Sequence, residues 1–324
     1  MFTGWDKISR ALLMAECIIG MLGNVFITLV NCSEWIKKQK ISLADFILTC
    51  LAISRFSYLL VSLFLSCILE FSPQLYASYK VATSTNMLWT MTNHLSTWFA
   101  TCLSIFYFLK IAHFSHSLFL WLKRRMDRVV LGLITFCMFL LIFELLWLDK
   151  FTDTLYFYIT DKSNLTFFSE ENGSLYVNTL ISLTLTYFIP FVLSLTSLLL
   201  LFLSLVRHTR NLQLNSMGSR DAGIQAHRRA MKMVLCFLIL FTVHWFSSQL
   251  MGWIFYTWWN HRLLVFIILA LHIFPSGHTF VLIMGNTRLR KAAFQALCHL
   301  QRDLREESKS FSFMDRFSRV FSRE

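Results

Sequence analysis

Seven stretches of this sequence are long and apolar enough to cross a lipid bilayer as helices, each of which needs about 20 predominantly apolar residues. They cover residues 8–32, 43–67, 84–112, 129–148, 179–206, 231–256 and 263–284. Hydrophobic residues make up 56% of the chain and charged residues only 15%, which excludes a disordered chain and argues against a soluble enzyme. We expect an all-α integral membrane protein whose seven transmembrane helices form a bundle over residues 1–286.

The third stretch has the weakest apolar character of the seven. Its polar residues recur at spacings of three or four, which places them on one face of a helix. They are Asn86, Thr90, Asn93, Thr97, Thr101 and Ser104. A polar stripe is stable inside a bundle and costly against lipid. We therefore expect this face to point into the bundle.

Lysine and arginine are divided unequally between the alternate gaps. The gaps 33–42, 110–128 and 207–232 and the segment 287–324 carry 23 of the 30 cations, and the opposite side carries six. The positive-inside rule then predicts an N-terminus outside the cell and a C-terminus in the cytosol. The net charge of +12 thus reflects orientation in a membrane and implies no nucleic-acid partner.

The long gap at 149–178 lies on the side that the charge rule assigns to the outside. It contains two glycosylation patterns, Asn164-Leu165-Thr166 and Asn172-Gly173-Ser174. Because the patterns and the charge rule are independent, they support each other. We predict Asn164 and Asn172 as glycosylation sites.

Arg55 stands in the middle of the second apolar stretch. A cation near the membrane midplane costs about 3 kcal/mol or more unless it is paired or hydrated. We expect its partners to be Asn24 of the first stretch, backbone carbonyls or water. Arg55 either switches between two arrangements of the bundle or pins the bundle in one, and the sequence does not distinguish these roles. Pro190 and Pro275 each permit a kink in a helix.

Trp89, Asn93 and His94 form a patch on the outer half of the third stretch. The patch combines an aromatic ring with hydrogen-bond donors and acceptors, as ligand pockets do. The same residues would also suit packing against neighbouring helices. Glu16 and Glu144 either pack near helix ends or pair with a cationic ligand. Since no spacing of Cys, His and carboxylates fits a zinc or catalytic site, we expect no metal, no cofactor and no enzymatic activity.

Basic residues crowd the cytosolic ends of the stretches and fit either a protein partner or anionic lipid. They are Lys123, Arg124, Arg125, His208, Arg210, His227, Arg228 and Arg229. Beyond the seventh stretch, apolar residues from Leu289 to Leu304 recur at helical spacing with cations around them. This pattern predicts a short amphipathic helix on the inner leaflet, followed by a basic tail, within 287–324.

Several short strings are more specific than the topology. They are Gly23-Asn24, Leu51-Ala52-Ile53-Ser54-Arg55, Phe106-Tyr107-Phe108-Leu109-Lys110-Ile111-Ala112, Ile189-Pro190-Phe191, His208-Thr209-Arg210-Asn211-Leu212, Ala226-His227-Arg228-Arg229 and Pro275-Ser276-Gly277-His278. With these strings the chain resembles the bitter taste receptors, the type 2 taste receptors, over nearly its whole length. The Asp-Arg-Tyr and Asn-Pro-x-x-Tyr patterns of rhodopsin-like receptors are absent.

The resemblance implies a G-protein-coupled receptor of the plasma membrane. It implies that bitter small molecules bind in the outer half of the bundle and that a gustducin-type heterotrimeric G protein binds at the basic cytosolic face. The ligand-binding residues expected on this basis are Trp89, Asn93, His94, Thr186, His244 and Ile268. The expected switch residues are Asn24, Arg55, Tyr107, Lys110, Pro190 and His278. Two positions depart from the family, since His244 stands where an aromatic switch is common and Ile268 where some members have Glu.

Two other classes compete with the receptor. A small-solute transporter or channel usually has repeated halves and broken polar helices near the midplane. An odd number of spans, only three prolines and no detectable repeat count against it. An intramembrane hydrolase needs a nucleophile beside a base, and no motif provides one. The sequence leaves open a homo- or hetero-oligomer, because lipid-facing and partner-facing apolar residues look alike.

Overall fold

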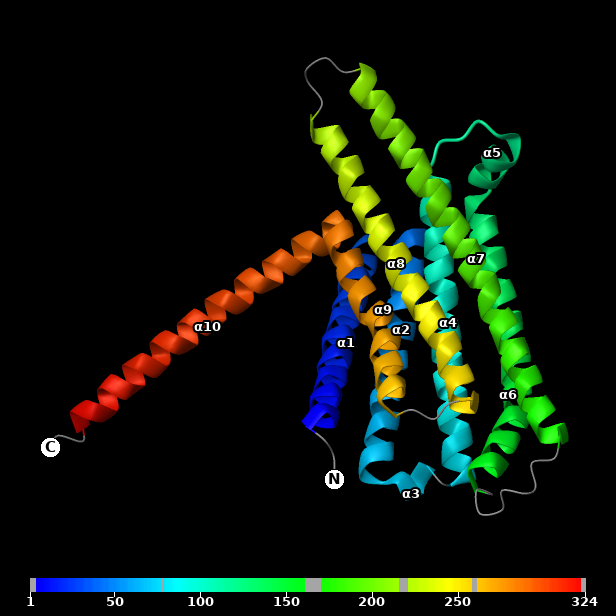
Figure 1. Cartoon of the computed structure of the whole chain (residues 1–324). Coiled ribbons are helices and arrows are strands. Elements are labelled where there is room, and N and C mark those ends of the chain that lie inside the picture. Colours follow the sequence, from blue (N-terminus) through cyan, green and yellow to red (C-terminus); the bar gives the residue numbers. More distant parts are fainter. Residues whose placement is uncertain (1–3, 77, 161–169, 216–220, 258–260, 322–324) are drawn as a thin grey trace. The chain divides into compact units, whose positions relative to one another are not determined.

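The computed structural model describes residues 4–76, 78–160, 170–215, 221–257 and 261–321, and all their regular structure is helical. The helices are α1 (Gly4–Lys38), α2 (Leu43–Phe71), α3 (Pro73–Tyr76), α4 (Tyr79–Ile111), α5 (Ser117–Arg124), α6 (Met126–Thr160), α7 (Glu170–Asn215), α8 (Asp221–Thr257), α9 (His261–Gly285) and α10 (Thr287–Phe321) (Figure 1). The chain divides into two units, Met1–Val281 and Leu282–Glu324.

Among the described residues, six helices are long and apolar enough to cross a membrane, namely α1, α2, α6, α7, α8 and α9. The helix of the third predicted span, α4, is not one of them. It is 33 residues long, but threonines, serines and asparagines interrupt its apolar sequence. The described part of the chain is thus all-helical with six membrane-capable helices, and the seventh span stays a prediction.

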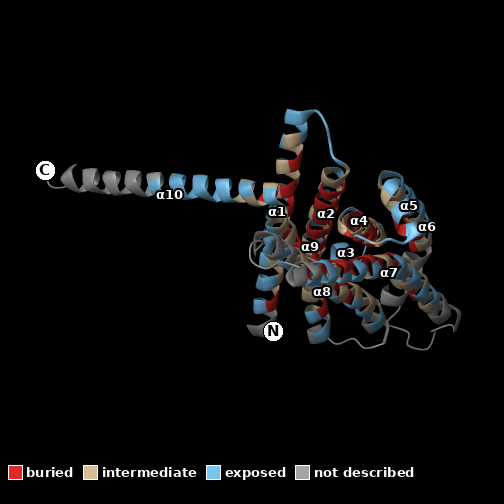
Figure 2. Cartoon of the chain, turned by 90° about the horizontal axis from the view of Figure 1, so that it is seen from above, coloured by how far each residue is buried: buried red, intermediate tan, exposed pale blue. Residues whose placement is uncertain are grey.

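The polar stripe of α4 points into the first unit, as predicted. Of its six predicted residues, Thr90, Asn93, Thr97, Thr101 and Ser104 are buried and Asn86 is half-buried. Helix α4 contacts α2 on one side and α6 and α7 on the other (Figure 2). Such a position suits a helix that would expose hydroxyl and amide groups to lipid anywhere else.

Within this stripe, the hydroxyls of Thr101 and Ser104 donate to helix carbonyls, and Thr101 also bonds to a hydroxyl of α7. The Thr101 hydroxyl lies 2.9 Å from the carbonyl oxygen of Thr97 and 3.3 Å from that of Pro190 in α7. Ser194 of α7 donates to the Thr101 hydroxyl over 2.9 Å. These hydrogen bonds link α4 to α7 at Pro190.

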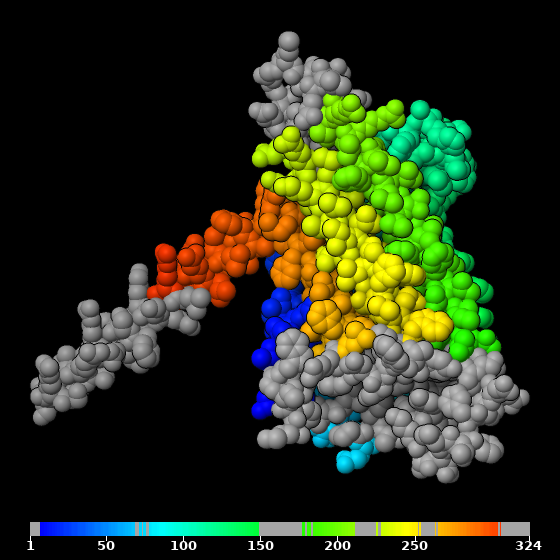
Figure 3. Space-filling model, in the orientation of Figure 1, coloured from blue at the N-terminus to red at the C-terminus, as the bar shows by residue number. Residues whose placement is uncertain are grey.

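Apolar side chains that the bundle leaves exposed lie on its outer helices. On α6, Leu131, Phe139, Ile142 and Leu146 are 60–70% exposed. Helices α7 and α8 lie side by side along the face seen in Figure 3. Since large exposed apolar surfaces are rare in soluble monomers, this arrangement fits a protein that lipid surrounds.

Several helices extend beyond the predicted spans. Helix α6 continues to Thr160, past the expected end at residue 148, and α7 occupies 170–215 where 179–206 was expected. Hydropathy locates only the membrane-spanning part of a helix, and helical backbone hydrogen bonding can continue into the more polar sequence on either side of it.

The segment after α9 is also more helical than predicted. The Asn286 side chain accepts hydrogen bonds from the backbone N–H groups of Arg288 (3.0 Å) and Leu289 (3.4 Å), which caps the N-terminus of α10. Helix α10 then runs for 35 residues, whereas a short helix was expected. No Gly or Pro occurs between Thr287 and Phe321, so nothing in the sequence ends the helix early.

Helices α1 and α9 meet through glycines. A Cβ atom at Gly20 would lie 2.3 Å from Ser276 Oγ and 2.9 Å from Ser276 Cβ, and one at Gly23 would lie 2.8 Å from Thr279 Cγ2. Ser276 is held in place because its hydroxyl donates to the Glu16 carbonyl over 3.2 Å. Close helix contact here requires residues without a side chain.

We expect Gly20→Ala to destabilise the protein by about 1–3 kcal/mol, because the added methyl group overpacks the α1–α9 contact. Gly132→Ala on α6 is the matched control, since its Cβ would meet no atom within 4 Å. Alanine favours a helix over glycine by about 1 kcal/mol, so the control should be neutral or stabilising. Thermal unfolding of the purified variants measures both effects. Equal shifts at the two glycines would contradict the close contact.

Candidate functional site

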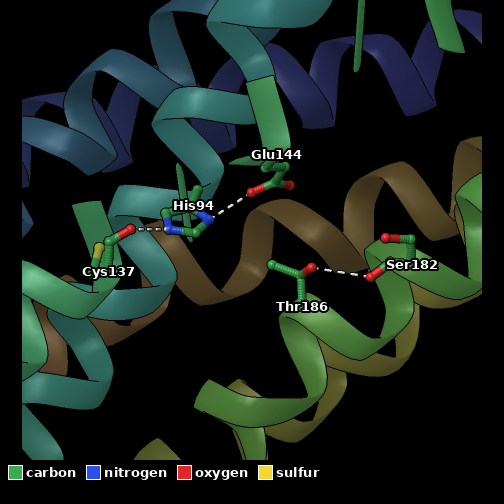
Figure 4. Close-up of polar contacts among 5 residues, drawn as sticks. All are labelled: His94, Cys137, Glu144, Ser182 and Thr186. Carbon is green, nitrogen blue, oxygen red and sulfur yellow. Dashed lines mark hydrogen bonds and ion pairs between the residues drawn. The ribbon is translucent and has the colours of Figure 1, made fainter. Parts of the chain in front are cut away.

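A buried ion pair joins α4 to α6. His94 Nδ1 lies 2.6 Å from Glu144 Oε2, and His94 Nε2 lies 3.1 Å from the carbonyl oxygen of Cys137 (Figure 4). The two side chains are 0% and 1% exposed. Glu144 thus packs between two helices, and its partner in the described structure is His94.

The hydrogen bonds of His94 determine the net charge of the His94–Glu144 pair. A backbone carbonyl only accepts hydrogen bonds, so Nε2 must carry a proton and donate it to Cys137. One further proton lies between His94 Nδ1 and the Glu144 carboxyl group. Wherever that proton resides, the pair as a whole is electrically neutral, and both ring nitrogens of His94 have partners within the protein.

Several polar atoms beside this pair are buried without a hydrogen bond. They include Asn93 Oδ1, Thr97 Oγ1, Glu144 Oε1 and the Tyr187 hydroxyl. Thr186, one residue before Tyr187 on α7, donates to the Ser182 carbonyl over 3.0 Å (Figure 4). Buried polar atoms usually have hydrogen-bond partners, so these unpaired atoms around the His94–Glu144 pair require an explanation.

An aromatic cluster lies between α2, α4, α8 and α9. Tyr58 is at its centre, with its ring centroid 6.1 Å from Trp89, 6.5 Å from His244 and 5.6 Å from His272. His244 Nδ1 donates to the Leu271 carbonyl over 3.0 Å, and His272 Nδ1 donates to the Ile268 carbonyl over 2.7 Å. Trp89 and His244 therefore both contact the Tyr58 ring. Ile268 is linked to this cluster because its backbone carbonyl accepts a hydrogen bond from His272.

Deeper in the bundle, Arg55 is fully buried and contacts α9. Its Nη2 lies 2.6 Å from His278 Nδ1, and its guanidinium carbon lies 4.6 Å from the centre of the Phe274 ring. Since Arg55 can only donate, His278 Nδ1 accepts. Arg55 Nε and Nη1 have no partner, and no carboxylate among the described residues pairs with this cation.

The expected pairing of Arg55 with Asn24 is wrong. The Asn24 amide donates to the Gly20 carbonyl over 2.8 Å and to the Pro275 carbonyl over 3.4 Å, and its Oδ1 accepts from Thr279 over 3.0 Å. Within α9, Asn24 is bonded to the Pro275 carbonyl and to the Thr279 hydroxyl, because this part of α9 lies beside α1. The amide therefore joins α1 to α9 without reaching Arg55.

The other expected switch residues lie apart from Arg55. Tyr107 and Lys110 both contact Phe106, the first by its ring (centroids 5.8 Å) and the second by its Nζ (5.2 Å from the ring centre). Pro190 meets Thr101 of α4 through its carbonyl oxygen. The structure does not gather the predicted switch residues into one cluster.

The predicted basic face follows the ends of α4, α5, α7 and α8. Lys123 Nζ donates to the Ala112 carbonyl over 2.9 Å, and the His208 ring stacks on His113 with centroids 6.3 Å apart. The guanidinium carbon of Arg125 lies 5.0 Å from the centre of the Trp121 ring. Exposed side chains there include Arg124, Arg210, Arg228 and Arg229.

Some predicted residues cannot be placed. Asn164 lies outside the described residues. Asn172 and His227 lie within α7 and α8 by their backbone, and their side chains are outside the described part of the structure. The glycosylation predictions and the His227 prediction therefore stay predictions.

A family model described as Taste receptor protein (TAS2R) matches residues 1–301 of the chain. The chain belongs to the type 2 taste receptor family. It is 57% identical to Taste receptor type 2 member 42 of Homo sapiens over 320 residues, which cover 93% of this chain and 96% of that protein. It is also 41% identical to Taste receptor type 2 member 7 of Macaca mulatta over 298 residues, which cover 90% of this chain and 94% of that protein.

Family membership confirms the predicted resemblance. The chain is a bitter taste receptor of the G-protein-coupled class, a multi-pass membrane protein that binds ligands and couples to G proteins, and it is not an enzyme. The alternative of a small-solute transporter or channel is not favoured.

Sequence reasoning missed residues that contact the predicted ones. Tyr58, Tyr187 and Phe274 connect the predicted residues to one another, but in the sequence they are ordinary aromatic residues of apolar helices. Glu144 was recognised as an ionisable residue within a span, but its pairing with His94 was not predicted. The available signal was that Glu144 and His94 both lie in the predicted outer halves of their spans, where a buried carboxylate needs a donor.

Proposed function

We propose that the receptor crosses the membrane seven times, with α4 as the additional span, its N-terminus outside and its C-terminus in the cytosol. The buried polar stripe of α4 supports a central span that neighbouring helices shield from lipid. The distribution of cations supports the orientation, with 23 of 30 on the cytosolic side. Residues 1–286 then form the transmembrane domain and 287–324 a cytosolic segment.

In the cytosolic segment, α10 serves as an amphipathic helix on the inner leaflet. Its exposed apolar side chains Phe294, Leu297 and Leu300 support this role, since each is at least 56% exposed. Arg290 and Lys291 lie nearby in sequence and suit anionic headgroups.

Ligands bind in the outer half of the bundle, near Trp89, Asn93, His94, Thr186, His244 and Ile268. The mixture of aromatic rings around Tyr58 with buried polar atoms around Asn93 supports this site. A hydrophobic Ile268 leaves aromatic stacking and hydrogen bonds as the main forms of recognition. His94 would act mainly by holding Glu144, because both its ring nitrogens are engaged.

One observation carries the proposed mechanism: a continuous set of ring contacts connects the outer site to Arg55. It passes from Trp89 through Tyr58 to His244, whose ring lies 5.1 Å from Phe274, and Phe274 lies under the Arg55 guanidinium. A ligand that shifts Trp89 or His244 changes the packing around Arg55 and His278. Ligand binding then favours a second arrangement of the bundle by its differential affinity for the two.

The second arrangement opens the basic cytosolic face to a gustducin-type heterotrimeric G protein at the plasma membrane. Lys123, Arg124, Arg125, His208, Arg210, His227, Arg228 and Arg229 form this face. Pro190 and the inner residues Tyr107 and Lys110 lie between it and the ligand site along the chain and would move with it. Glycosylation at Asn164 and Asn172 and a homo- or hetero-oligomeric state remain part of this proposal.

Calcium imaging tests the function in cells that carry the receptor and a gustducin-type G protein, screened with a panel of bitter compounds. We expect responses that require both components, because the receptor has no other route to the calcium signal. Cells lacking either component are the controls. A ligand-dependent current or solute uptake without the G protein would overturn the proposal and favour a transporter.

A further inference from the structure

Where α4, α6 and α7 meet, several buried polar atoms have no hydrogen-bond partner. Asn93 Oδ1, Glu144 Oε1 and the Tyr187 hydroxyl are each buried and without a hydrogen bond. The three residues are 2%, 2% and 8% exposed. They belong to three different helices, so no local turn geometry explains their unpaired state.

These atoms are close neighbours. The Tyr187 hydroxyl lies close enough to Asn93 and Glu144 to interact with both, yet forms a hydrogen bond of normal geometry with neither. The Tyr187 ring also packs edge-on against His94, with centroids 6.3 Å apart. The second oxygen of Glu144 points away from His94 (Figure 4). Tyr187 can therefore move without losing a hydrogen bond.

Charge decides what kind of group would complete the cluster. Asn93 Oδ1 and Glu144 Oε1 are acceptors only, and so they require a donor. An ammonium group would add a positive charge beside a His94–Glu144 pair that is already neutral, and an anion would meet the carboxylate oxygen. A neutral hydroxyl or amide N–H supplies the donor and leaves the buried charge unchanged.

We propose that Glu144 Oε1, with Asn93 and Tyr187, is a specificity-determining acceptor subsite for the neutral hydroxyl or amide N–H end of an otherwise apolar, aromatic ligand. The proposal rests on the ligand site proposed above and names its ligand class. His94 is a positioning residue, since it holds Glu144 and neutralises it. The aromatic rings around Tyr58 would take the apolar body of the ligand.

Three compounds with one aromatic body test this class: 2-naphthylmethanol, its methyl ether and protonated 2-naphthylmethylamine. Purified receptor in lipid nanodiscs is heated with increasing amounts of each, and apparent Kd is taken from the ligand-induced shift in Tm. We expect the alcohol to bind about tenfold more tightly than the ether, which offers no donor to the buried acceptor, and than the amine, whose donors bring an uncompensated positive charge into the site.

Variants at Glu144 and His94 test whether the preference for the alcohol over the ether comes from the proposed subsite. Glu144→Gln keeps a carbonyl oxygen at this position and should keep the preference for the alcohol over the ether. The double variant His94→Leu/Glu144→Leu removes the Glu144 acceptor together with its buried charged partner and leaves only Asn93 Oδ1 as an acceptor, so it should lose most of the preference for the alcohol over the ether. Glu16→Gln changes a carboxylate on α1 outside the subsite and should behave as the wild type.

The proposal is overturned if the wild type binds the amine best, shows no preference for the alcohol or binds none of the three compounds. It is equally overturned if the double variant keeps the preference. These outcomes are separate from the fate of the proposed function. If the receptor gives calcium responses but shows no preference for the alcohol, only the proposed subsite is contradicted. If it prefers the alcohol but gives no G-protein-dependent response, only the proposed signalling role is contradicted.

Discussion

Replacing His94 by leucine is expected to destabilise the receptor by about 3–5 kcal/mol, because the change leaves Glu144 as an uncompensated charge in the bundle. Glu144→Leu should cost a similar amount, since it strands His94 between α4 and α6. The double variant should recover most of the loss, because two apolar side chains fill the site without a buried charge. Thermal unfolding of the purified receptor and its surface expression measure the effect.

The comparison is a double-mutant cycle, which isolates the interaction between the two residues. Glu16→Gln serves as the control for removing a carboxylate from a transmembrane helix elsewhere. Simple addition of the two single effects in the double variant would show that His94 and Glu144 act independently. That result would contradict the ion pair.

The second large effect is expected at Arg55. Arg55→Met should raise the Tm of the receptor and abolish agonist-dependent signalling. Stability should rise because Arg55 is buried with one hydrogen bond and two unpaired donors, and replacing such a charge by an apolar group is often stabilising by about 1–4 kcal/mol. Signalling should fall because the two arrangements of the bundle would no longer differ in how they satisfy the cation.

Measured together, Tm and the calcium response at matched surface expression separate the two roles that the sequence left open. A residue that pins one static arrangement gives a lower Tm when replaced, whereas a switch gives a higher Tm and no response. Leu60→Met, at an exposed apolar position on the same helix, controls for the introduced methionine. A fully responsive Arg55→Met receptor would refute the switch.

The sequence predicted the parts of the fold that depend on periodicity. The stripe from Thr90 to Ser104 on α4 was recognised as inward-facing because polar residues recurred every three or four positions, and burial confirms it. Helix ends were predicted poorly. Hydropathy reports where a helix meets lipid, and it does not mark the ends of α6 at Thr160 and α10 at Phe321 because apolar and polar residues are mixed there.

Partners within the bundle were beyond sequence reasoning. Arg55 and His278 are 223 positions apart, and His94 and Glu144 are 50 apart. An isolated sequence shows that each needs a partner, because a buried ionisable group is costly, but it offers many donors and acceptors at the same depth. Asn24 was a reasonable choice for Arg55 by depth alone, but its amide donates to the carbonyl oxygen of Pro275 instead.

The most direct test of the central claim is guanine-nucleotide exchange on a purified gustducin-type G protein, with receptor in lipid nanodiscs and an agonist from the bitter panel. We expect the agonist to accelerate exchange with the wild-type receptor and to have no effect with Arg55→Met, although the variant still binds it. Equal acceleration by both receptors, or none by the wild type with an agonist that it demonstrably binds, would contradict a receptor that signals through Arg55.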